Sequence, residues 1–239
     1  MDKLFMVMPA YNEEDNIAEV IESWYPLLRL GDSDSRMVIA DSGSVDRTHA
    51  ILVDFCRTHD QLEILSDTDR QHGPKLIALY KYAIESGADY VFQTDSDGQT
   101  TPPQFCEFWN LRNNYDAIIG KRCVRGDGQQ RKFVEDVLCR LLRHYFSVRL
   151  DDANAPFRLM CTSLLQRYID RLPVNYNLPN VMLTAWFAYY HENVVFREIT
   201  FRARQGGVNS INIRRIVEIG LHALADFRQF RKEMEVPAK

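Results

Sequence analysis

The sequence predicts an α/β fold in which a mostly parallel sheet carries helices on both faces. Short apolar runs alternate with longer amphipathic segments, which is the pattern of strands joined by helical crossovers. The chain has 239 residues, of which 46% are hydrophobic and 26% charged, so it is long enough for one large α/β domain. Several apolar runs also end in polar motifs at the same point of the repeating pattern. These motifs point to a site along one edge of the sheet.

The strands and helices are expected in strict alternation through the first half of the chain. Five short apolar runs predict strands at 4–8, 37–40, 62–65, 90–93 and 117–120. The segments between them have helical periodicity and predict helices at 16–30, 46–59, 75–86 and 103–113. Gly87 follows the third helix and predicts its C-cap, because glycine adopts the left-handed conformation that ends many helices.

Beyond residue 131 the pattern changes to longer helices, expected at 133–148, 178–190 and 211–234, with a strand at 194–201. The polar, glycine-containing stretch 121–131 predicts a mobile loop beside a site. We expect residues 1–210 to form one domain. Residues 211–239 then add an amphipathic helix, either packed on that domain or lying at a membrane surface with basic side chains on its polar face.

Composition excludes several classes of protein. The net charge of −4 argues against a dedicated nucleic-acid binder. Five cysteines, odd in number and without a Cys-x-x-Cys pair, favour reduced thiols in a cytoplasmic protein over disulfides or a zinc site. No stretch approaches the roughly 18 uncharged apolar residues that a membrane span needs. We therefore expect a cytoplasmic protein that meets a membrane face peripherally, if at all.

The segment Tyr90–Gly98 is the most informative one. Its apolar run stops on two carboxylates, Asp95 and Asp97, that are separated by Ser96 and followed by glycine, which predicts a buried strand entering a tight turn. Two such carboxylates suit Mg²⁺ or Mn²⁺, which completes its shell with water and substrate phosphates. The alternative is an acidic turn without a metal. An EF-hand is excluded because its glycine and its last glutamate are replaced by Thr100 and Cys106.

Two other strand ends carry polar motifs, Pro9-Ala-Tyr-Asn-Glu13 and Asp41-Ser-Gly-Ser-Val-Asp46. Each alone also fits ordinary turn and cap chemistry. Ligands of parallel sheets bind beyond the carboxyl ends of the strands, where these motifs meet the acidic pair. Lys75 follows a glycine at a predicted helix start, which favours a phosphate. The chain has neither a P-loop nor a Gly-x-Gly-x-x-Gly turn, which removes the commonest NTPase and NAD-binding readings.

Taken in order and spacing, the motifs at 9–13, 41–46 and 95–97 resemble those of family 2 glycosyltransferases with the GT-A fold, a Rossmann-like sheet. The likeness runs from about residue 4 to 215. The segments Asp152-Ala-Asn-Ala-Pro-Phe-Arg158 and Arg202–Ser210 resemble the branch that glycosylates polyprenyl or dolichyl phosphate. Residues 1–210 would then be a catalytic domain. This chain has Ser42 and Pro156 where members of the family often have an acid and a glycine.

The resemblance implies a role for each matching residue. The nucleoside would be contacted by Pro9, Tyr11, Glu13 and Asp41. Asp95 and Asp97 would hold Mg²⁺ or Mn²⁺ on the donor diphosphate, with Ser96 and Gln99 beside them. Candidates for phosphate contacts are Lys75, Arg122, Arg158 and Arg204. Asp152 and Asp97 would be the catalytic aspartates. Asp152 would lie near the reacting sugar and act as a base, a metal ligand or an orienting group.

The implied activity is metal-dependent, inverting transfer of a sugar from a UDP- or GDP-sugar to a polyprenyl phosphate. Two alternatives stay open, namely transfer to a saccharide hydroxyl in cell-surface polysaccharide synthesis and an inactive nucleotide-sugar-binding relative. A sugar nucleotidyltransferase is disfavoured, because its Gly-rich stretch after the first strand is replaced here by Pro9–Asn12. Most bacterial members of the branch continue into transmembrane helices. Since this sequence stops at Lys239, we expect a separate membrane-anchoring protein or a different acceptor.

Overall fold

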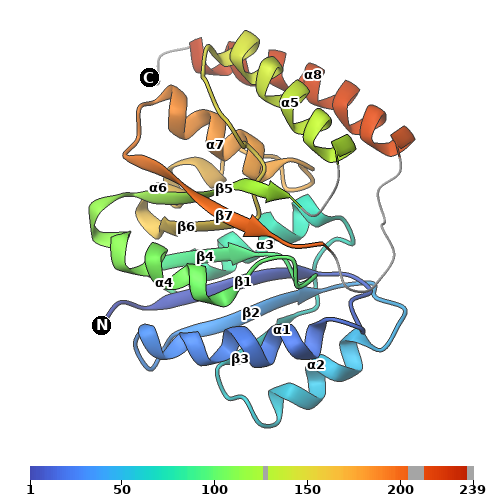
Figure 1. Cartoon of the computed structure of the whole chain (residues 1–239), viewed down its shortest axis with the longest axis vertical. Helices are drawn as coiled ribbons and strands as arrows, with labels where there is room; N and C mark the ends of the chain where they lie inside the picture. The colour runs from blue at the N-terminus through green and yellow to red at the C-terminus, as the bar shows by residue number, and fades with distance from the viewer. Residues whose placement is uncertain (126–128, 204–212, 236–239) are drawn as a thin grey trace.

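The computed structural model describes residues 1–125, 129–203 and 213–235 (Figure 1). Seven strands form one sheet in the order β3-β2-β1-β4-β6-β5-β7. The strands are β1 (Leu4–Ala10), β2 (Arg36–Asp41), β3 (Leu62–Leu65), β4 (Tyr90–Thr94), β5 (Ala117–Arg125), β6 (Phe157–Cys161) and β7 (Val194–Phe201). The α-helices are α1 (Ile17–Trp24), α2 (Thr48–Cys56), α3 (His72–Glu85), α4 (Pro102–Leu111), α5 (Gln129–Phe146), α6 (Thr162–Ile169), α7 (Pro179–Tyr189) and α8 (Ile213–Glu235).

The sheet is parallel except at β6, which runs antiparallel to both of its neighbours, β4 and β5. The strand order reverses between β1 and β4, because β2 and β3 lie on one side of β1 and β4 lies on the other. The carboxyl ends of β1, β2 and β4 therefore meet at one edge around this switch point, where ligands of open α/β sheets bind.

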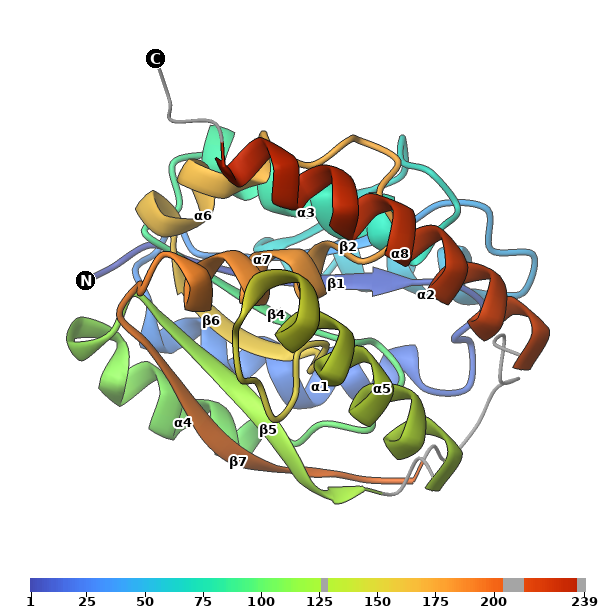
Figure 2. The ribbon, with the colours of Figure 1, turned by 90° about the horizontal axis from the view of Figure 1, so that it is seen from above.

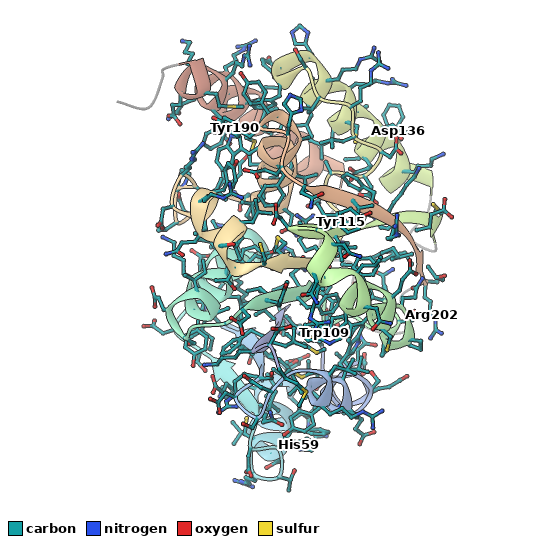
Figure 3. The ribbon with its side chains drawn as sticks, turned by 90° about the vertical axis from the view of Figure 1, so that its left-hand side faces the viewer. His59, Trp109, Tyr115, Asp136, Tyr190 and Arg202 are labelled. Carbon is teal, nitrogen blue, oxygen red and sulfur yellow. The ribbon has the colours of Figure 1, made fainter. Side chains whose placement is uncertain are left out.

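Helices cover both faces of the sheet, as the sequence predicts (Figure 2). One buried cluster joins α1, α2 and α4 to the sheet, and Trp24 stacks on Phe92 of β4 within it at a centroid distance of 5.4 Å. The opposite cluster joins α3, α5, α6, α7 and α8 to the other face. Side chains fill the space on both sides (Figure 3). Because strands such as β1 are buried on both faces, they read as continuous apolar runs in the sequence.

Three expectations about the elements were wrong. The segment 121–131 is not one loop, because β5 continues to Arg125 beside β7 and α5 already begins at Gln129. The predicted helix 16–30 changes at Trp24 into the 3₁₀ helix η1 (Tyr25–Leu30), where Pro26 lacks a backbone N–H for the α-helical ladder. The elements β6 and α6 were not predicted, because the short apolar run of β6 is interrupted by Arg158 and continues into α6 without a connecting loop.

The described part of α8 packs on the domain through its apolar side. Ala223, Phe227 and Phe230 are buried, with Phe227 against Phe146 of α5 and Phe230 against Trp186 of α7 at centroid distances of 5.7 and 5.4 Å. Among the described residues, no helix has the length and apolar character of a membrane span.

Candidate active site

The loops that follow β1 and β2 are joined by reciprocal hydrogen bonds. The Asn12 amide N–H donates to Ser44 Oγ at 3.0 Å, and the Val45 N–H donates to Asn12 Oδ1 at 2.9 Å. The Glu13 N–H donates to Thr48 Oγ1 at 2.8 Å. Two polar motifs that are about 30 residues apart in the sequence therefore form one rigid rim. This explains why both motifs are rich in short polar side chains.

Asp41 and Tyr11 lie on this rim with opposite exposures. Asp41, the last residue of β2, is 3% exposed, and its carboxylate accepts hydrogen bonds from Ser44 Oγ and from His49 Nδ1. Gly43 adopts φ +78, a conformation that side chains disfavour, and turns the chain just beyond Asp41. Tyr11 is 41% exposed, so its ring is open to a flat ligand such as a nucleobase.

Glu13 is buried on this rim, as Asp41 is. It is 7% exposed, its Oε2 accepts a hydrogen bond from Asn16 Nδ2 at 2.9 Å, and its carbonyl receives the N–H groups of Asn16 and Ile17. These bonds fix the start of α1. Pro9 lies within β1, where its carbonyl accepts the Ser96 hydroxyl at 2.8 Å.

Asp95 and Asp97 follow β4 at the switch point. Asp95 Oδ1 accepts hydrogen bonds from Gln93 Nε2 at 3.3 Å and from His72 Nε2 at 3.2 Å. Asp97 Oδ1 accepts the Gln99 N–H at 3.1 Å, across a turn in which Gly98 has φ +72. The His72 side chain is 56% exposed; partial desolvation lowers its pKa, but the Asp95 carboxylate outweighs this effect, so the pKa is raised overall.

The acidic pair fits a divalent metal that also binds a substrate. Among the described residues, no group of three or more His, Cys, Asp or Glu side chains is arranged as a complete metal cage. Mg²⁺ and Mn²⁺ are commonly bound through one or two carboxylates and take their remaining ligands from water and phosphates. The donor set of Asp95 and Asp97 matches this chemistry.

Ser96 and Gln99 are both 2% exposed and hold strands together beside the acidic pair. Ser96 donates to β1, as described above. Gln99 Nε2 donates to the carbonyl of Arg202, whose N–H returns a hydrogen bond to the carbonyl of Gln99. Arg202 lies just beyond the end of β7 (Figure 3). The acidic turn is thus attached on both sides, to β1 and to the segment after β7. Arg204 lies outside the described residues.

Lys75 is a buried cation in the first turn of α3. It is 1% exposed, its Nζ donates to the Ala10 carbonyl at 2.5 Å, and it lies 5.4 Å from the centroid of the Tyr11 ring. Burial lowers the pKa of Lys75 to about 8, although the Asp41 and Asp69 carboxylates act in the opposite direction. Lys75 therefore belongs to the rim of β1 and β2, between the carboxylate of Asp41 and the aromatic face of Tyr11.

A buried hydrogen-bonded network beneath the acidic pair was missed by the sequence reasoning. Asn180 Nδ2 donates to Gln93 Oε1 at 3.0 Å, and Tyr80 OH donates to Asn180 Oδ1 at 2.7 Å. Gln93 is the residue that donates to Asp95, so the network supports that carboxylate from below. The available signal was Asn180 itself, a polar residue at the start of the otherwise apolar, buried helix α7.

Arg158 is part of this network. It is fully buried in β6, and its guanidinium donates to the carbonyls of Ala155 at 2.9 Å and Asn180 at 3.2 Å, and to Thr184 Oγ1 at 3.2 Å. Burial lowers the pKa of Arg158. The expected phosphate contact is not among these interactions, because the side chain faces core carbonyls. Its contacts instead join the Asp152 segment to α7.

Asp152 forms a buried ion pair with Arg122. Arg122 Nε and Nη2 donate to the two carboxylate oxygens at 2.7 Å each, and the Arg122 backbone N–H donates to Oδ2 at 3.1 Å. Glu135 of α5 accepts from the same guanidinium at 3.2 Å and receives the Ala153 N–H at 2.8 Å. This network borders a cavity of about 260 Å³ that Lys121, Lys132, Asp136 and Asp151 also line. Because β5 runs parallel to β4, the cavity opens at the same edge as the acidic pair.

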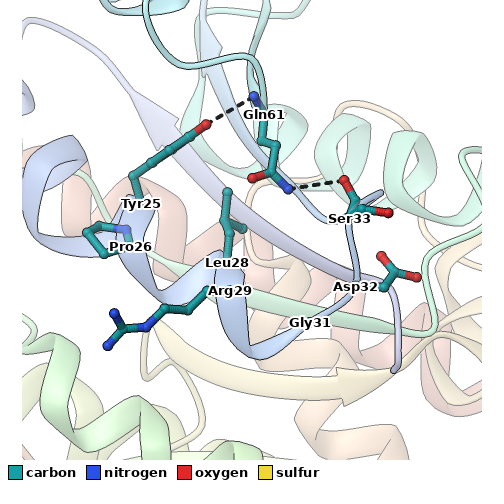
Figure 4. A pocket seen from close by; sticks show the side chains of 8 residues that line it. All are labelled: Tyr25, Pro26, Leu28, Arg29, Gly31, Asp32, Ser33 and Gln61. Carbon is teal, nitrogen blue, oxygen red and sulfur yellow. Dashed lines mark hydrogen bonds between the residues drawn. The ribbon is translucent and has the colours of Figure 1, made fainter.

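A second hollow, of about 390 Å³, lies at the opposite edge (Figure 4). Its walls come from η1 and from the residues just before β2 and β3, including Tyr25, Arg29 and Gln61. The Gln61 N–H donates to Tyr25 OH at 3.2 Å. This hollow is at the amino ends of the parallel strands, so it is separate from the site described above.

Comparison with known proteins identifies the family. A model of glycosyl transferase family 2 matches residues 5–171, which is most of the chain. The chain belongs to glycosyltransferase family 2. Its fold is GT-A, as the sequence predicts.

The curated relatives and solved structures agree with this assignment. The chain is 25% identical over 210 residues to an uncharacterized glycosyltransferase of Synechocystis, covering 84% of this chain and 63% of the relative. It is 23% identical to the bactoprenol glucosyl transferase of Shigella phage SfV, covering 95% and 73%. A crystal structure of glucosyl-3-phosphoglycerate synthase from Mycobacterium tuberculosis, with Mn²⁺, UDP-glucose and glycerol 3-phosphate, superposes with a TM-score of 0.70 at 17% identity, covering 96% and 80%. The chain thus spans less than two thirds of the Synechocystis relative.

Proposed function

We propose that this glycosyltransferase moves a sugar from a UDP-sugar to a polyprenyl phosphate, in a divalent-metal-dependent reaction that inverts the anomeric carbon. The observation that carries the proposal is the meeting of an acidic pair and a polar cavity at one sheet edge. Asp41, Asp95 and Asp97 lie at the ends of β2 and β4, and a cavity of mixed charge opens at the same edge. A metal-bound diphosphate fits the acidic pair, and the lysines of the cavity wall, Lys121 and Lys132, would meet the phosphate of the acceptor.

On the donor side, the rim of β1 and β2 receives the nucleoside. Tyr11 stacks on the base, Asp41 accepts an N–H of the base, and Lys75 contributes positive charge beside them. Asp95 and Asp97 hold Mg²⁺ or Mn²⁺, which neutralises the negative charge on the leaving diphosphate. The network through Gln93 and Asn180 keeps Asp95 oriented before the donor arrives.

On the acceptor side, Lys121 and Lys132 are the cations of the cavity wall that would meet an acceptor phosphate, next to the carboxylates that share the wall. A phosphate monoester is already ionised at neutral pH, so it needs no general base. Asp152 has both oxygens engaged by Arg122, which favours a role in orienting that guanidinium over a role as a base. The remaining contribution of the chain is to hold acceptor and anomeric carbon in line.

Two relatives support a lipid phosphate as the acceptor class. They are named as a bactoprenol glucosyl transferase and as an undecaprenyl-phosphate 4-deoxy-4-formamido-L-arabinose transferase from Proteus mirabilis. The latter match covers 55% of this chain and 40% of the relative, at 23% identity. The superposed synthase was solved with phosphoglyceric acid as well, so a small soluble phosphate is the competing acceptor.

A product assay separates these acceptors. The purified chain would be incubated with radiolabelled UDP-glucose or GDP-mannose, Mn²⁺ and one acceptor at a time: undecaprenyl phosphate in detergent, 3-phosphoglycerate or an oligosaccharide. We expect label from UDP-glucose in the organic phase with undecaprenyl phosphate alone. Label in the aqueous phase with either other acceptor would overturn the acceptor assignment. Label transferred from the GDP-sugar alone would overturn the donor assignment.

A further inference from the structure

Charge is distributed unevenly along the chain and across the fold. Residues 1–69 contain 15 Asp and Glu against 5 Lys and Arg, a net charge of −10. The remaining residues contain 18 acids against 24 bases, a net charge of +6, which together give the chain its −4. In the fold, the acidic part forms the end with β2, β3, α1 and α2, and the helices α5 and α8 lie side by side at the other end (Figure 1).

The outer side of α5 is basic and carries an exposed aromatic ring. Lys132, Arg140 and Arg143 are exposed on this helix, and Phe133 is 66% exposed beside the first of them. The opposite side of the helix, with Leu142 and Phe146, is buried against the domain. Asp136 is the one acid exposed on α5 among the side chains that the structure describes (Figure 3).

The neighbouring helix α8 extends this surface. Its apolar side packs inward, as described above, so it has no described apolar face left for a membrane. Arg228 and Lys232 are exposed on it together with one acid, Glu233, and Arg228 Nε donates to the hydroxyl of Tyr145 on α5 at 3.2 Å. That hydrogen bond fixes the two helices relative to each other. Figure 2 shows both helices on the outside of the molecule.

We propose that this basic helical face, made of Lys132, Phe133, Arg140, Arg143, Arg228 and Lys232, docks the enzyme on an anionic lipid surface. Opposite charge attracts the face to the headgroups, and the Phe133 ring enters the boundary between headgroups and acyl chains. The proposal extends the proposed function, because it brings the acceptor cavity to the height of a lipid phosphate. Lys132 belongs to both the face and the cavity wall, so the two are adjacent.

Two observations favour a lipid surface over a nucleic acid. The chain as a whole carries a net charge of −4, and its acidic end would be repelled by a long polyanion. Phe133 is exposed on α5 beside Lys132 of the cavity wall, so its ring can insert between lipids close to the acceptor cavity. A bilayer also contacts only one face of the protein, so the acidic end can point away from the anionic headgroups.

The test is sedimentation of the full chain with phosphatidylcholine vesicles, with and without phosphatidylglycerol. We expect binding only to the vesicles that contain phosphatidylglycerol, and loss of that binding at high salt. The double variant Arg140→Gln/Arg143→Gln should lower the partition coefficient about 30-fold, since each cation near such a surface contributes roughly fivefold. Phe133→Ser should lower it further.

The matched control is Arg29→Gln/Arg57→Gln, which removes the same charge from exposed positions at the acidic end and should leave vesicle binding unchanged. Equal binding by both double variants, or no binding of the unmodified chain to either vesicle, would overturn the proposed face. UDP binding, measured in parallel without lipid, tests the proposed function independently of the docking face. Vesicle binding without UDP binding would sink the donor assignment and leave the docking face standing.

Discussion

The donor side and the acceptor side of the site are built in different ways. On the donor side, Asp95 at the end of β4 has a side chain that is 22% exposed and rests on hydrogen bonds from neutral groups and His72. On the acceptor side, Arg122, Asp152 and Glu135 are only 8, 3 and 7% exposed and form one ion-pair network. Substitutions in the acidic pair should therefore affect chemistry more than folding, whereas substitutions in this network should affect both.

The largest effect on activity is expected from Asp97→Ala on the donor side. Loss of one carboxylate from the acidic pair should lower sugar transfer by at least about 100-fold, because the charge on the leaving diphosphate is no longer neutralised. The thermal midpoint should stay near that of the unmodified chain. Asp60→Ala, which removes an exposed acid at the opposite edge of the sheet, is the matched control. Unchanged transfer by Asp97→Ala would remove the acidic pair from the mechanism.

Arg122→Gln tests the acceptor side. Removing the guanidinium leaves two buried carboxylates without their cation, which should cost about 3–5 kcal/mol of unfolding free energy. Arg197→Gln breaks the exposed pair with Glu107 and should cost less than about 1 kcal/mol. Urea titration measures both variants. If the two variants lose the same stability, the buried network does not depend on the Arg122 guanidinium more than a surface pair depends on its own.

The pH dependence of UDP binding tests Lys75. Lysine is charged below its pKa, and burial lowers this pKa to about 8, so the cation is present at pH 7 and is lost as the pH rises through that value. UDP affinity should fall about tenfold between pH 7 and 9, because the protonated fraction of Lys75 falls by about that factor over the same range. The variant Lys75→Met should bind more weakly at pH 7 and lack this decline. A parallel decline in the variant would assign the titration to another group.

The smallest effect on transfer is expected from Asn180→Leu, which acts on Asp95 through Gln93. The change should raise the Mn²⁺ concentration for half-maximal transfer by a few fold and cost about 2 kcal/mol of stability, since two buried polar groups lose a partner. Tyr80→Phe removes only the bond to Asn180 Oδ1, so it should lose stability while keeping the Mn²⁺ midpoint. If Asn180→Leu and Tyr80→Phe both raise the Mn²⁺ concentration for half-maximal transfer, the network only supports the fold.

The donor side could be predicted from the sequence because its chemistry lies at the ends of parallel strands. The apolar runs mark β1, β2 and β4, and the polar residues that follow them, such as Tyr11, Asp41 and Asp95, must meet at one edge. The sequence also assigned Ser96 and Gln99 to this region. Their contacts with Pro9 and Arg202 could not be predicted, since the partners are about 90 and 100 residues away.

The acceptor side was harder to predict for two physical reasons. The strand β6 is short, is interrupted by Arg158 and runs directly into α6, so its apolar residues gave no distinct signal. Arg158 and Arg122 look alike in a sequence, yet the first is enclosed by core carbonyls and the second borders a cavity. Burial of a cation depends on packing between β6 and α7, which the local sequence does not encode.

The central claim is that the strand ends of β1, β2 and β4 form a metal-dependent nucleotide site. Calorimetric titration of the purified chain with UDP and with GDP, each with and without Mn²⁺, tests it most directly. We predict that UDP binds only when Mn²⁺ is present, and that Asp97→Ala abolishes this binding. If neither nucleotide binds to the folded chain, or if UDP binds equally well without the metal, the assignment of Asp95 and Asp97 is contradicted.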